Sequence, residues 1–104
     1  MTLFAAHLLP TIKKTLRESS SDFDDEIGSC IDECADDLQN AGILSSFFVP
    51  SASINSQIQR AVKWYCLSVY GLYNADMEKY DKAYRSLKAT LCTQRKYTEA
   101  SHGV

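Results

Sequence analysis

Apolar side chains recur every three or four residues along most of this chain, which is the period of an amphipathic α-helix. The pattern is clearest over residues 54–70 and 76–94, and a break at residues 71–76 with glycine, asparagine and aspartate separates the two stretches. A break of this composition between two helical patterns predicts a helical hairpin. With the helices predicted before it, the sequence indicates a small all-α domain of about four helices that ends in this hairpin.

The first helix is predicted to begin at Pro10 or Thr11, since proline is favoured in the first turn of a helix. Ile12 and Leu16 then lie one turn apart on one face, and the serine run at residues 19–21 interrupts the pattern.

A second helix is predicted to start after Asp22 or Asp24, where acids complement the helix dipole, and to run to about Ala41. Gly42 is the expected C-terminal cap, because glycine adopts a left-handed conformation without a side-chain penalty. One face of this helix is apolar and consists of Phe23, Ile27, Cys30, Ile31, Cys34, Ala35, Leu38 and Ala41.

Residues 43–53 are predicted to form an ordered loop in which Phe47 and Phe48 pack back on the helices. The alternative is an exposed apolar plug for a partner surface.

The third helix is predicted to be capped by Ser51 or Ser53. Trp64 and Leu67 lie off its main apolar face, and a helix that is apolar on two sides is usually buried on two sides. The residues that bury this second side belong either to a neighbouring subunit or to the rest of the monomer, and both alternatives remain open. The main face comprises Ile54, Ile58, Ala61, Val62, Tyr65 and Val69.

The last helix is predicted to begin at Asn74 as its N-cap, with Asp76 and Glu78 in the first turn. Tyr84 and Leu87 are expected to pack across the hairpin against Ile58, Val62 and Tyr65. Residues 1–97 are predicted to form a single domain and residues 98–104 a disordered tail. The core stripe is Met77, Tyr80, Tyr84, Leu87 and Leu91, and the residues expected to face away from it are Lys79, Lys82, Arg85 and Lys88.

The charge distribution is lopsided, although the net charge is only -2. Eight of the thirteen acids lie in residues 22–37, and six of the eleven bases lie in residues 79–96. A sequence-reading nucleic-acid domain would normally carry a basic face without a matching acidic one. The asymmetry favours charge-complementary contacts between elements or between copies of the chain. Solvated helix faces would give the same pattern.

Cysteine spacing gives little support for a metal site. Cys30 and Cys34 lie one helical turn apart, and a tetrahedral zinc site would need Cys66 and Cys92, or a histidine, to converge on them. Reduced cysteines in the core are the favoured interpretation, and a cysteine-ligated metal module is the weaker one. No phosphate-binding loop, metalloprotease motif or nucleophile elbow occurs, so we expect no enzyme activity and no cofactor.

With these patterns in view, the chain resembles the small head-tail connector (adaptor) proteins of long-tailed bacteriophages. No single motif is diagnostic, and the resemblance depends on the order and spacing of the segments over residues 12–97. The segments that carry it are Ile12-Lys13-Lys14-Thr15-Leu16-Arg17, Asp24-Asp25-Glu26-Ile27, Asp37-Leu38-Gln39-Asn40-Ala41-Gly42-Ile43, Ala61-Val62-Lys63-Trp64-Tyr65-Cys66 and Tyr84-Arg85-Ser86-Leu87-Lys88.

The resemblance implies a structural virion protein, made in the cytoplasm of the bacterial host and located at the capsid vertex. There it would form a ring, typically of twelve copies, beneath the portal protein, extend the DNA channel and dock a head-completion or tail protein. DNA would pass through without sequence-specific binding, and no membrane would be involved. The residues expected to face the channel are Asp25, Asp32, Glu33 and Asp36. The residues expected at the subunit interface are Trp64, Leu67, Asp36, Asp37, Lys82 and Arg85.

The competing prediction is a small cytosolic helical protein that binds other proteins or acts as a regulatory dimer. Such a protein would have the same core but a compact two-fold interface.

Overall fold

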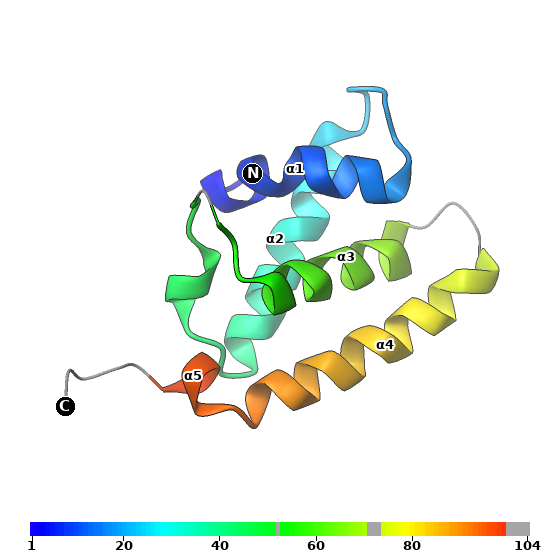
Figure 1. Cartoon of the computed structure of the whole chain (residues 1–104). Helices are drawn as coiled ribbons and strands as arrows, with labels where there is room; N and C mark the ends of the chain where they lie inside the picture. The colour runs from blue at the N-terminus through cyan, green and yellow to red at the C-terminus, as the bar shows by residue number, and fades with distance from the viewer. Residues whose placement is uncertain (52, 71–73, 100–104) are drawn as a thin grey trace.

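The computed structural model describes residues 1–51, 53–70 and 74–99, with the side chains of residues 74 and 75 left out of the description (Figure 1). Every regular element within these ranges is helical, which confirms the predicted all-α class. The elements in chain order are α1 (Leu3–Leu16), α2 (Asp24–Asn40), the short 3-10 helix η1 (Ser45–Phe48), α3 (Ser56–Tyr70), α4 (Asn74–Cys92) and α5 (Arg95–Thr98).

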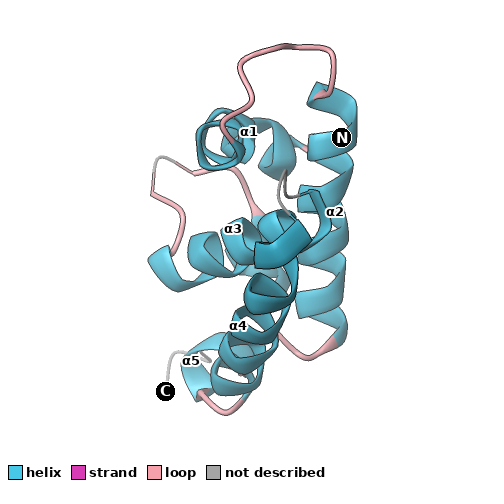
Figure 2. Cartoon of the chain, turned by 90° about the vertical axis from the view of Figure 1, so that its right-hand side faces the viewer, coloured by secondary structure: helices cyan, strands magenta, loops and turns pink. Residues whose placement is uncertain are grey.

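Helix α3 is the centre of the arrangement, because it packs against each of the other three long helices. Figure 1 shows α3 in front of α2, with α1 above and α4 below. In the perpendicular view of Figure 2, α2 runs along one side of the molecule and α3 lies further toward the other side. The side chains of α3 that are fully buried among these neighbours are Ile58, Ala61, Val62 and Cys66.

Helix α1 begins seven residues before the predicted start at Pro10, so that prediction is wrong. The side chain of Thr2 caps the helix by accepting a hydrogen bond from the Ala5 amide at 3.1 Å. Pro10 lies inside the helix at an exposed position, where water can reach the carbonyl of Ala6 that lacks its amide donor. The buried stripe of α1 is Phe4, Ala5, Leu8, Ile12 and Leu16.

The bounds of helix α2, from Asp24 to Asn40, follow the prediction closely. Phe23 and Ala41, which were predicted on its apolar face, flank the helix and are exposed. Gly42 has a φ of +112°, and its amide donates to the carbonyl of Gln39 at 3.0 Å. The amide of Ile43 donates to the carbonyl of Leu38, also at 3.0 Å. These two bonds form a Schellman motif, which confirms Gly42 as the glycine that ends the helix.

The loop after α2 packs back on the helices, as predicted. Phe48 meets Phe4 edge to face with ring centroids 5.5 Å apart, and Phe47 lies 5.1 Å from Tyr97. Tyr97 in α5 is buried, and its carbonyl accepts a hydrogen bond from the Leu44 amide at 2.8 Å. The sequence did not predict α5, which attaches the end of the described chain to this loop.

The cap of α3 is Asn55, so the prediction of Ser51 or Ser53 is wrong. The Asn55 side-chain oxygen accepts hydrogen bonds from the amides of Gln57 at 2.9 Å and Ile58 at 3.2 Å. Val69, which was predicted to be on the apolar face, is 47% exposed near the end of the helix.

The stripe on α4 is confirmed in part. Tyr84 and Leu91 are buried and Leu87 is half-buried, and the rings of Tyr84 and Tyr65 meet edge to face at 5.2 Å across the hairpin. Lys88, which was expected to face away, is half-buried and points to α2 instead.

Three sequence predictions lie partly or wholly outside the described residues. They are the break at residues 71–73, the capping side chain of Asn74 and the tail from residue 100. Within the described range Thr98 is the last residue of α5.

Replacing Leu91 by alanine should lower the free energy of unfolding by about 2–5 kcal/mol, because a side chain that is 1% exposed leaves both lost transfer energy and a cavity. Leu87→Ala is the matched control on the same helix and should cost less, since Leu87 is only half-buried. Urea denaturation followed by circular dichroism measures both. A larger loss for Leu87→Ala would contradict the observed packing.

Candidate functional site

The described residues contain no constellation typical of an active site. No group of three or more histidine, cysteine, aspartate or glutamate side chains within them is arranged to hold a metal ion. The free cysteines do not converge on a ligand site either: Cys30, Cys34 and Cys66 are buried, and Cys92 is half-buried, where its thiol donates to the Ala41 carbonyl at 3.4 Å.

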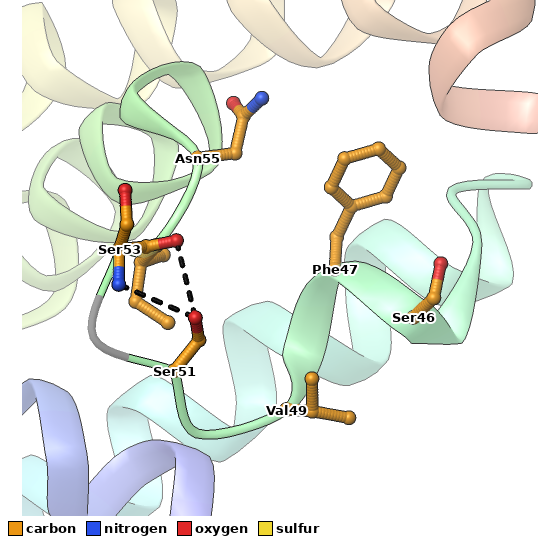
Figure 3. Close-up of a pocket in the computed structure, with 7 residues that line it drawn as sticks. Ser46, Phe47, Val49, Ser51, Ser53 and Asn55 are labelled. Atoms are coloured by element: carbon orange, nitrogen blue, oxygen red, sulfur yellow. Dashed lines mark hydrogen bonds between the residues drawn. The ribbon is translucent and has the colours of Figure 1, made fainter.

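A hollow of about 320 Å³ lies between η1 and the start of α3 (Figure 3). The hydroxyl oxygen of Ser51 accepts a hydrogen bond from the Ser53 amide at 3.2 Å, so this side chain stabilises a local turn. None of the described residues that line the hollow is charged. The lining residues are Ser46, Phe47, Val49, Ser51, Ser53, Ile54 and Asn55.

The charged faces of the helices are therefore the candidate functional surface. Helix α2 presents acids on the side away from its buried stripe, and of the four residues expected to face a channel Asp25, Glu33 and Asp36 are exposed. Asp32 is half-buried because its carboxylate accepts hydrogen bonds from the amide and hydroxyl of Thr2, which fixes the start of α1.

Glu33 also has a contact within the chain, since it accepts a hydrogen bond from the Tyr65 hydroxyl at 3.3 Å. Burial and the neighbouring Glu33 carboxylate raise the pKa of Tyr65 to about 12. At the other end of the acidic run, Asp24 forms an ion pair with Lys13 of α1 at 2.8 Å. Several of the acids thus hold the helices of one subunit together, a role that local sequence patterns did not reveal.

Asp37 contacts two side chains of another helix. It accepts a hydrogen bond from the Tyr84 hydroxyl at 2.5 Å and pairs with the Lys88 ammonium at 3.0 Å, so it joins α2 to α4. Burial alone would raise the pKa of the Asp37 carboxyl, but the bonds from Tyr84 and Lys88 and the nearby charges outweigh it and hold the pKa below its usual value. Asp37 was expected at a subunit interface, and in the structure it serves an interface between helices.

The bases expected at the subunit interface lie on the exposed side of α4. Lys82 pairs with Glu78 at 3.4 Å, and Arg85 pairs with Asp81 at 3.0 Å, each one helical turn away. These four side chains are 45–79% exposed, so each pair contributes little to stability, yet it already balances the charge of its base.

Trp64 and Leu67 are both half-buried and pack partly against the core. The guanidinium carbon of Arg60 lies 5.9 Å from the centroid of the Trp64 ring, a cation–π distance. Lys63 follows on the same side of α3. The sequence reasoning did not select Arg60 or Lys63, although α3 carries these two bases and no acid.

The described residues thus form a small all-α fold with charged faces on its helices. A family model described as phage connector protein matches residues 8–98, which is most of the chain. The chain therefore belongs to the phage connector protein family, a family of structural proteins. No curated protein and no solved structure shows significant similarity to it. No described helix combines the length and the apolar character that crossing a bilayer requires.

Replacing Tyr84 by phenylalanine keeps the ring packing but removes the hydrogen bond to Asp37. We expect the free energy of unfolding at neutral pH to fall by about 1 kcal/mol. This loss is small for a hydrogen bond to a charged group, because the Asp37 side chain is 41% exposed and water screens its charge. Tyr80→Phe is the control, because no described side chain bonds to its hydroxyl.

The pH dependence of the stability provides a second test of the hydrogen bond between Tyr84 and Asp37. The pKa of Asp37 is lowered in the folded state, so its contribution is present above the unfolded carboxyl value of about 3.9 and is lost as the pH falls through the folded value. When the free energy of unfolding is plotted against pH, its fall below pH 4 should therefore be less steep for Tyr84→Phe than for the wild type. Parallel curves would show that Tyr84 does not stabilise the carboxylate.

The thiols of Cys34 and Cys66 should resist alkylation in the native protein. Burial raises the pKa of both thiols, that of Cys34 to about 12, so little thiolate forms at neutral pH. Iodoacetamide labelling read by peptide mass spectrometry should modify Cys92 first and reach the other two only after unfolding. Stoichiometric zinc by elemental analysis, or unfolding on chelation, would overturn the interpretation of these cysteines as reduced core residues.

Proposed function

We propose that this protein is a head-tail connector subunit that forms a ring beneath the portal at the capsid vertex. The observation that carries the proposal is the family match over residues 8–98. On this proposal the subunit is made in the cytoplasm of the bacterial host, assembles in the virion as a dodecamer, extends the DNA channel and offers a docking surface to a head-completion or tail protein.

The surface charge supports a channel through which DNA passes without binding. Phosphate contacts to lysine and arginine add up to strong binding, so a lining for moving DNA should lack them. Asp25, Asp32, Glu33 and Asp36 were expected to line it. Among them Asp25 and Asp36 suit the role best, because both are exposed and neither forms a salt bridge within the described residues.

Ring formation also suits the size of the subunit. A single small domain buries a limited fraction of its surface, and contacts with two neighbours and a portal supply further burial. A heterologous contact repeated around a closed ring requires two different, complementary faces on each subunit.

Electron microscopy of virions labelled with an antibody to this chain tests the location. The label should lie at the head-tail junction, and the purified chain should bind portal rings and appear there as an added layer with rotational symmetry. A control with portal-free capsids should show no binding. A tight two-fold dimer that ignores the portal, with label absent from the junction, would support the regulatory-dimer alternative and overturn the proposal.

A further inference from the structure

The outward side of α3 carries both bases and apolar surface, and α3 contains no acid. α1 and α4 flank α3 and α2 lies behind it (Figure 1). On the remaining side Arg60 is exposed, and Lys63, Trp64 and Leu67 are half-buried. At 100° per residue, Arg60, Lys63, Trp64 and Leu67 cluster on the side opposite the buried Ile58 and Val62. We call these four residues the α3 outer face.

The bases of the α3 outer face differ from those of α4 in one respect. Lys82 and Arg85 each have an intrahelical carboxylate partner, whereas Arg60 and Lys63 form no salt bridge within the described part of the chain. Arg60 instead lies against the ring of Trp64. Tryptophan and arginine are the residues most enriched at the centres of protein interfaces.

A complementary face exists on the same subunit. Asp36 is exposed on the side of α2 opposite its buried stripe. Glu33, three residues earlier, is exposed at the edge of α2 that faces α3, where it accepts the hydrogen bond from Tyr65. Arg60 and Lys63 have the same spacing, so both pairs span about 4.5 Å along their helix axes. Because α2 packs against α3 through its buried side, Asp36 and the α3 outer face lie on opposite sides of this pair of helices.

Opposite directions are what a closed ring requires. In a dodecamer successive copies are related by a rotation of only about 30°, so the two contact faces of each subunit must point almost opposite ways. We propose that the α3 outer face docks on the Glu33 and Asp36 face of α2 in the next copy of this chain. The occupant is a second copy, argued from charge complementarity and from the matched spacing, and this inference rests on the proposed ring.

The contact divides the acids of α2 between two roles. Asp36 and Asp25 are separated by eleven residues, or about 16 Å of helix. The C-terminal half of α2 therefore serves the neighbouring copy, and its N-terminal half remains available to the channel. The proposal replaces Asp37, Lys82 and Arg85 as interface residues, since each of them forms a salt bridge within the subunit.

The test is charge reversal with a matched control. Arg60→Glu/Lys63→Glu should weaken self-association at least tenfold, by sedimentation velocity of the chain alone and by ring counts in electron microscopy with portal. Lys82→Glu/Arg85→Glu makes the same charge change at the same spacing on α4 and should alter association by less than about threefold. Circular dichroism must show wild-type helical content for each variant that is compared.

Rescue identifies the partner face. Adding Glu33→Lys/Asp36→Lys to the α3 variant should restore ring formation, whereas the α2 variant alone should weaken it as much as the α3 variant does. If the α3 reversal leaves wild-type rings, or if only the α4 reversal breaks them, this contact is wrong while the connector function stands. If the wild type forms no assembly at any concentration or with the portal, both proposals are overturned.

Discussion

Burial of α3 on three sides is the constraint on which the rest of the molecule depends. One helix of a small chain cannot bury Ile58, Ala61, Val62 and Cys66 without neighbours on several sides, and α1, α2 and α4 supply them. Since apolar burial is the dominant favourable term in folding, these contacts fix where the other helices lie. They also determine which surface remains, because the side of α3 that no helix covers becomes a face of the protein.

Charge is distributed according to the same geometry. Acids at the edges of α2 meet neighbouring helices and are used there: Asp24 with Lys13, Asp32 with Thr2, and Asp37 with Tyr84 and Lys88. The bond to Asp37 matters most for the shape of the hairpin, because it connects α4 directly to a helix other than α3. A carboxylate with two donors is held more firmly than an exposed ion pair, which is worth little in water.

The sequence predicted the helical class and the bounds of α2, because the acids in its first turn and Gly42 at its end are local signals. It missed the start of α1, since Pro10 is equally compatible with a first turn and with an exposed interior position. The cap of α3 had several candidates, and only the fold shows that Asn55 also accepts from Tyr97 at 3.2 Å. The contact between Asp37 and Tyr84 joins residues 47 positions apart, and a local pattern cannot reveal such a pair.

The same limit explains why the interface that we propose differs from the one predicted from the sequence. From the sequence, a base counts toward an interface simply because it is charged and lies off the apolar stripe, as Lys82 and Arg85 do. In the folded chain a base matters for assembly only if no nearby carboxylate already balances it and if it adjoins apolar surface that water leaves at a cost. Arg60 and Lys63 meet both conditions beside Trp64, and they do so because α3 is the helix that the others surround. The demands of the core thus determine which charges remain available to a neighbouring copy.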